Sequence, residues 1–167
     1  LVYFENSTTP ETQYFVSSDG LSAKPLRSTP TFFDADGIVT LQYTATSSDG
    51  TEIPYFVTAR EGVLEAGPAP TVQYGYGGFP ISLLPPYSGT TGKLWRERGG
   101  VYVTANIRGG GEFGPAWHQA VLKENRQLAF DDFFAVSEDL IARGITTPGQ
   151  LGIYGGSNGG LLVGVAM

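Results

Sequence analysis

A serine set among glycines near the end of the sequence constrains this chain more than any other feature. Residues 155–159 read GGSNG, and residues 151–154 (LGIY) before them have the apolar character of a short strand. The residues after position 160 are apolar and small, as in a helix packed beneath a sheet. Glycines leave room for a sharp bend between the two elements. The pattern therefore predicts a strand, a tight turn that exposes Ser157, and a helix.

A Gly-x-Ser-x-Gly turn between a strand and a helix is typical of the nucleophile of α/β-hydrolases, and an acidic residue and a histidine follow it along the chain. The ten residues after Ser157 contain neither. We therefore expect the chain to be a fragment of a longer enzyme, with those two groups beyond Met167. The motif alone leaves open a glycine-rich structural turn with a buried serine.

Short strands and turns dominate the first sixty residues. Residues 1–4 and 14–16 read as strands, and residues 39–45 and 53–58 flank the turn residues at positions 49–50 (DG), which predicts a β-hairpin.

Strands alternate with helices in the rest of the chain. Runs at 71–74 and 101–107 have strand character, and apolar residues between 130 and 141 recur at helical spacing. We expect Asp131 and Asp132 in the first turn of this helix, where the helix dipole favours negative charge, and Gly144 at its end. This order predicts an α/β fold with a mostly parallel sheet and helices on both faces.

Composition excludes several classes of function. The 167 residues carry a net charge of -6 without a cluster of Lys or Arg, which argues against nucleic-acid binding. No apolar run approaches about 18 residues, so we expect no membrane span. The lack of cysteine excludes a disulfide and fits a reducing compartment. A cytoplasmic location is therefore expected, while a periplasmic or secreted one stays open.

Two other motifs could indicate bound groups. Residues 34–37 (DADG) resemble the start of a calcium loop but lack its later Glu, so a plain turn is favoured. Residues 109–114 (GGGEFG) match the dinucleotide pattern G-x-G-x-x-G, with acidic residues about 20 positions on. Pro115 and Trp117 stand where a regular helix should continue, and those acids begin a helix instead of closing a strand. We predict no cofactor and no metal.

Few titratable residues are candidates for chemistry within the chain. His118 is the only histidine, and it precedes Ser157, which is the wrong order for this fold. We expect it to pack or to form hydrogen bonds. Asp131 and Asp132 fail the same test of order. Arg108, beside three glycines, is expected to organise a loop by hydrogen bonds.

Four blocks of sequence, in this order, resemble the prolyl oligopeptidases, serine peptidases that cleave short peptides after proline. The blocks are residues 48–56 (SDGTEIPYF), 74–79 (YGYGGF), 105–114 (ANIRGGGEFG) and 155–162 (GGSNGGLL). The resemblance covers about residues 30–167 and is looser before them.

The resemblance implies a two-domain enzyme, in which a β-propeller lies over an α/β-hydrolase domain. Residues 1–31 would be the end of the propeller, and residues 32–167 the first part of the hydrolase domain. By motif match, Ser157 is the nucleophile, and the oxyanion hole consists of the Asn158 backbone N–H and the Tyr76 hydroxyl. Phe79 matches a wall of the proline pocket, although a core aromatic is the alternative. Short proline-containing peptides would be the substrates, and the full-length form is expected to be a monomer.

Two alternatives remain from the sequence. Oligopeptidase B, which cleaves after basic residues, shares the glycine-rich block, but it usually has Ala where this chain has Asn158 and tends to depart from the GGF of residues 77–79. A non-catalytic, hydrolase-like binding protein that kept the serine turn is the other possibility.

Overall fold

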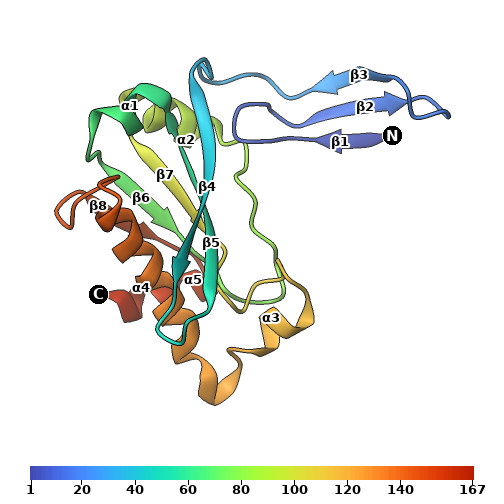
Figure 1. The fold of residues 1–167 in the computed structure, drawn as a ribbon. Coiled ribbons are helices and arrows are strands. Elements are labelled where there is room, and N and C mark those ends of the chain that lie inside the picture. Colours follow the sequence, from blue (N-terminus) through green and yellow to red (C-terminus); the bar gives the residue numbers. More distant parts are fainter.

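Five strands form the larger of two β-sheets in the computed structural model, which describes residues 1–167 (Figure 1). The hairpin predicted around positions 49–50 is confirmed: its strands pair from Ile38 opposite Arg60 to Thr46 opposite Glu52, and Gly50 adopts φ +84°. In spatial order the strands are β4 (Ile38–Thr46), β5 (Glu52–Arg60), β7 (Val101–Ala105), β6 (Thr71–Tyr74) and β8 (Leu151–Tyr154).

The five-stranded sheet is mixed, so the prediction of a mostly parallel sheet is wrong for half of it. Strands β7, β6 and β8 are parallel, whereas the β4–β5 and β5–β7 pairs are antiparallel. The connection from β5 to β6 explains this, because residues 61–70 are too few for a crossover between parallel strands, which needs a dozen or more. They hold the short helix α1 (Glu61–Ala66).

The core lies between one face of this sheet and α4 (Gln127–Ala142). Alternate residues of β5, such as Ile53, Tyr55 and Val57, are fully buried on that face, as the two-residue period of a strand requires. The Tyr55 hydroxyl donates to Asp139 of α4 at 2.6 Å. Helix α5 (Asn158–Ala166) contacts α4 and β8 and adds Leu162 to the same core (Figure 1).

Helix α4 begins earlier than the sequence pattern indicated. It starts at Gln127, because residues 127–129 (QLA) are good helix formers that extend it toward the N-terminus. The prediction that Asp131 and Asp132 lie in its first turn is therefore wrong, and no acidic residue occupies that turn. The predicted end is confirmed, since Gly144 follows the helix at φ +71° and its N–H donates to Ile141 O.

The opposite face of the sheet is only partly covered. Tyr102 and Thr104 of β7 face a cavity of about 560 Å³, which is also lined by residues of the 82–96 segment. That segment contains α2 (Gly89–Leu94) and leads into the 3₁₀ turn η1 (Arg96–Arg98). The sequence pattern had not indicated these short elements.

A separate antiparallel sheet precedes this body and projects from it (Figure 1). Its strands are β1 (Val2–Phe4), β2 (Thr12–Val16) and β3 (Ala23–Ser28), of which the first two were predicted. All residues of β1 and β3 are exposed. One junction to the larger sheet is Ser7, whose hydroxyl shares a hydrogen bond of 2.8 Å with that of Thr40.

None of the helices combines the length and the apolar character that crossing a bilayer requires. The acidic residues and the histidine form no group of three that could hold a metal ion. Residues 34–37 form a turn in which Asp36 N donates to Asp34 Oδ1 at 3.0 Å, and Arg60 pairs with the Asp34 carboxylate at 3.3 Å.

Candidate active site

Ser157 occupies a sharp turn between β8 and α5. The strand ends at Tyr154, the helix begins at Asn158, and Ser157 between them is exposed. Its backbone has φ +54° and ψ -119°, a backbone conformation that residues with a side chain rarely adopt. Such strain costs on the order of 1–3 kcal/mol and persists where the surroundings enforce it. The predicted strand, turn and helix are thus confirmed, and the strained turn is the geometry of a hydrolase nucleophile.

Close backbone contacts explain two of the glycines around Ser157. A Cβ at Gly155 would lie 2.4 Å from Gly159 O, and one at Gly159 would lie 2.5 Å from Gly75 O. At Gly156 nothing lies within 4 Å of such an atom, and at Gly160 the nearest neighbour is 3.8 Å away. The need for a residue without a side chain therefore falls on Gly155 and Gly159, and not on Gly156 or Gly160.

The segment after β6 runs directly past this turn. Because Gly159 packs against Gly75 O, the two backbones touch, and the Asn158 side chain reaches the next residue: its Nδ2 donates to Tyr76 O at 2.5 Å. The structure thereby brings together Tyr76 and Asn158, which are 82 positions apart in the sequence.

Two donors in this region, from residues 158 and 76, are uncommitted within the protein. The backbone N–H of Asn158 and the hydroxyl of Tyr76 donate to no protein acceptor. The Asn158 N–H lies in the first turn of α5, where unpaired amides and the helix dipole favour negative charge. This arrangement suits the stabilisation of an oxyanion that forms on a carbonyl attacked by Ser157.

Phe79 lies on the surface next to Asn158 and is not a core aromatic. Its side chain is 69% exposed, and its backbone has φ +53°. Together with Asn158 and Leu161 it lines a cavity of about 500 Å³. The charged residues on that lining are Lys123 and Arg126, and no carboxylate is among them.

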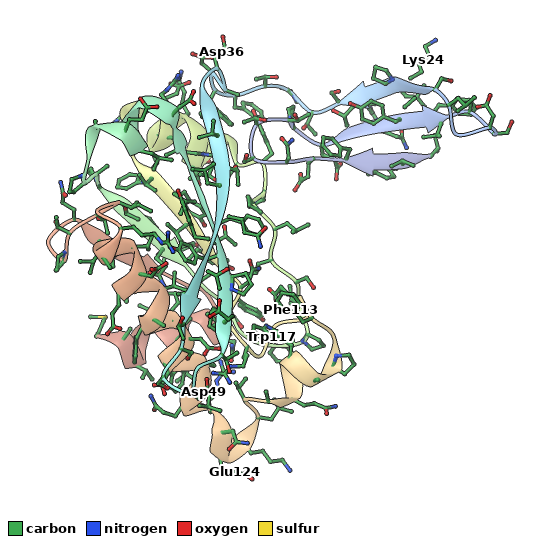
Figure 2. All side chains as sticks on the ribbon, viewed as in Figure 1. Lys24, Asp36, Asp49, Phe113, Trp117 and Glu124 are labelled. Atoms are coloured by element: carbon green, nitrogen blue, oxygen red, sulfur yellow. The ribbon has the colours of Figure 1, made fainter.

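Arg108 is the buried centre of an ion-pair network. The prediction that Arg108 organises its loop by hydrogen bonds is therefore confirmed. Its Nη2 lies 2.7 Å from Asp132 Oδ1, and its Nη1 lies 2.6 Å from Asp49 Oδ2 at the hairpin turn labelled in Figure 2. These bonds raise the pKa of Arg108 and hold the pKa of Asp49 well below its usual value. The sequence pattern had indicated neither acidic partner.

The loop that Arg108 fixes lies directly against the segment after β6. A Cβ at Gly109 would lie 2.3 Å from Gly77 O. The amides of Gly109, Gly110 and Gly111 all donate to carbonyls of this chain, so they are not free to bind a pyrophosphate. The glycine-rich block thus serves close packing.

His118 forms a hydrogen bond, as the sequence predicted. It directly follows Trp117, whose ring packs edge-on against that of Phe113 (Figure 2). The His118 Nδ1 lies 2.6 Å from Gly109 O. Because a carbonyl only accepts, Nδ1 carries the proton. No hydrogen bond joins His118 to Ser157.

Comparison with known proteins shows which family this chain resembles. The family model described as the prolyl oligopeptidase family matches residues 86–167. An uncharacterized peptidase of Sinorhizobium fredii is 52% identical over 166 residues, which are 99% of this chain and 23% of that protein. A prolyl endopeptidase of Elizabethkingia miricola is 40% identical over 164 residues, with 98% and 23% covered. The solved structure of a post-proline cleaving enzyme from Rickettsia typhi is 48% identical, with a TM-score of 0.90 over 99% of this chain and 24% of that one.

The similarity extends over nearly all of this chain, although the chain spans only 23% of the length of these curated relatives. It therefore includes the segment after β6, which lies outside the residues that the family model matches. This chain belongs to the prolyl oligopeptidase family of serine peptidases.

Proposed function

We propose that the polypeptide carrying these residues is a serine endopeptidase that hydrolyses short peptides on the carboxyl side of proline. The observation that carries the proposal is the exposed, strained Ser157 in the turn between β8 and α5, followed at once by the uncommitted backbone N–H of Asn158.

In the proposed reaction, Ser157 Oγ attacks the carbonyl carbon of the scissile bond while a base takes its proton. The negative charge that forms on the carbonyl oxygen is stabilised by the Asn158 N–H and the Tyr76 hydroxyl. The base then gives the proton to the leaving amine, an acyl-enzyme remains on Ser157, and water hydrolyses it. No hydrogen bond joins His118 to Ser157, and His118 precedes the serine in the chain, so we assign the base and its acidic partner to residues outside these 167.

Preference for proline is supported by the surroundings of Phe79. Its exposed ring offers an apolar wall, as a pyrrolidine ring requires, and the neighbouring cavity is lined by Lys123 and Arg126 without a carboxylate. A pocket for a basic side chain needs negative charge, so this lining disfavours the cleavage after Lys or Arg that oligopeptidase B performs. The two relatives whose names refer to proline support the same preference.

We further propose that residues 1–31 are the last strands of a β-propeller and residues 32–167 the first part of an α/β-hydrolase domain. The separate three-stranded sheet before residue 32 supports this division, as does the parallel β7–β6–β8 half of the larger sheet, whose last strand leads into the nucleophile turn.

The test is steady-state kinetics on the complete enzyme. With a short peptide that carries a chromogenic group after proline, Ser157→Ala should lower kcat by about 10⁶-fold, because loss of the nucleophile acts on the transition state. Ser18→Ala, at an exposed turn serine, is the matched control and should leave kcat unchanged. Preferred cleavage after Lys or Arg would instead favour an oligopeptidase B activity, and turnover independent of Ser157 would refute the proposal.

A further inference from the structure

Residues 76–79, here called the oxyanion segment, have a strained backbone. Gly77 adopts φ +61° and Phe79 adopts φ +53°. Because Phe79 has a side chain, its conformation needs support from neighbouring structure. The segment belongs to no helix or strand, so regular hydrogen bonding does not supply that support.

One support comes from α5. The Asn158 carboxamide donates to Tyr76 O, and the same side chain packs closely on Gly78, where an added Cβ would lie 2.7 Å from Asn158 Nδ2. The side chain of Asn158 therefore fixes the backbone of Tyr76, while its own backbone N–H stays uncommitted beside Ser157.

A second support comes from the residue before α4. Arg126 Nη1 donates to Gly77 O at 2.7 Å, and the Arg126 guanidinium lies 5.5 Å from the centre of the Phe130 ring. No carboxylate pairs with this guanidinium, and burial lowers its pKa. A cation that is desolvated without an acidic partner costs stability, so its position calls for another explanation.

The two donors converge on successive carbonyls of one strained segment, one from the first residue of α5 and the other from the residue before α4. We propose that the Asn158 carboxamide and the Arg126 guanidinium are positioning residues that hold the Tyr76 hydroxyl at the oxyanion hole. This inference rests on the proposed function, because it concerns how the same site is kept in its working geometry.

Holding a donor in place has a defined kinetic consequence. Neither side chain is assigned a bond to substrate, so each acts on the transition state only through Tyr76. Removal of either positioning side chain therefore cannot lower kcat by more than loss of the Tyr76 hydroxyl does. We expect Asn158→Ala, which keeps the backbone N–H, and Arg126→Met each to lower kcat by about three- to tenfold with little change in KM.

A double-mutant cycle on the complete enzyme tests this route. In the Tyr76→Phe background, Asn158→Ala and Arg126→Met should each change kcat by less than about twofold, because the donor they position is already gone. Asn125→Ala and Arg98→Met replace exposed residues of the same types and should leave kcat unchanged in both backgrounds. Effects that multiply fully with that of Tyr76→Phe would overturn the inference.

Amide hydrogen exchange supplies a readout that does not depend on activity. Amides of residues 77–79 should exchange faster in Asn158→Ala and Arg126→Met than in the unmodified protein, whereas Ser157→Ala should not change them. Unchanged exchange in both positioning variants would overturn the inference. If Ser157→Ala leaves turnover intact, the proposed function fails on that result, and exchange alone then decides whether the two side chains hold the segment.

Discussion

Arg108 and Asp132 form a bidentate ion pair from which solvent is almost excluded. Arg108 Nε lies 2.9 Å from Asp132 Oδ2, Nη2 lies 2.7 Å from Oδ1, and the two residues are 5% and 0% exposed. The Arg108 backbone N–H also donates to Oδ2 at 3.0 Å. The pair therefore joins the loop after β7 to α4. Gly109 of the same loop packs closely against Gly77 O of the oxyanion segment.

Breaking this pair from one side should be strongly destabilising. Asp132→Asn leaves the buried guanidinium without its full countercharge, and such losses typically cost about 3–5 kcal/mol. Asp131→Asn is the matched control on the next residue, because the Asp131 carboxylate bonds Ser48 in an exposed position and its replacement should cost less than about 1 kcal/mol. Equilibrium unfolding in urea measures both changes, and equal losses would show that burial of the pair is not the cause.

The Asp49 side of the network should make stability depend on pH. Arg108 lowers the pKa of Asp49, so the charged form stabilises the fold. For a lowered pKa, that stabilisation is fully present above the unfolded value of about 3.9 and is lost as pH falls toward the folded value. About a third of the Asp49 side chain is exposed, so the effect should stay below about 1 kcal/mol.

Calorimetry of the protein and of Asp49→Asn between pH 2 and 7 tests this expectation. The difference in Tm should be constant from pH 7 to about 5 and should narrow below about pH 4, where the Asp49 carboxylate of the unfolded chain takes up a proton while the folded one stays charged. A difference that is as large at pH 3 as at pH 7 would contradict it.

Neighbouring glycines in the nucleophile turn should respond differently to the same substitution. Gly155→Ala forces a methyl group to within 2.4 Å of Gly159 O, so the turn must open and Ser157 must move. Gly156→Ala places its methyl group in open space. We expect kcat of the complete enzyme to fall by at least about 10²-fold for Gly155→Ala and by less than about threefold for Gly156→Ala, since small misplacements of catalytic groups are costly. Similar activities would show that the turn relaxes.

Local signals in the sequence were sufficient for the hairpin and for the strand, turn and helix around Ser157. Each depends on neighbouring residues, whose spacing is read directly. The order and direction of the paired strands were harder to predict, because the antiparallel β5–β7 contact joins segments that are far apart in the chain.

The role of Asp132 was missed for a related reason, although the sequence did contain a signal. Asp132, Val136 and Leu140 lie four residues apart and are all buried on one stripe of α4. A carboxylate at such a core-facing position requires a buried partner. The identity of that partner, Arg108, depends on the tertiary fold, as does the contact of Asn158 with Tyr76 O.

The 167-residue chain alone should hydrolyse no peptide. An unassisted serine keeps its proton near neutral pH, and the one histidine is bound to Gly109 O without a hydrogen bond to Ser157. The purified chain, incubated with a chromogenic peptide that contains proline, should show no turnover that depends on Ser157. Turnover that Ser157→Ala abolishes would place a base within these residues.

Replacing Tyr76 by Phe separates a catalytic role of its hydroxyl from packing of its ring. The charge that this hydroxyl would stabilise develops only after Ser157 attacks, so the hydrogen bond should act on the transition state more than on bound substrate. Loss of one such donor costs about 10²–10³ in kcat in other enzymes. Here we expect a smaller loss of about tenfold or more, because the Asn158 N–H remains as a second donor. KM should change little.

The measurement is steady-state kinetics on a slow peptide for which chemistry limits the rate. Because the Tyr76 hydroxyl bonds no other protein group, its removal should not disturb the fold, and an unchanged kcat would exclude Tyr76 from the oxyanion hole.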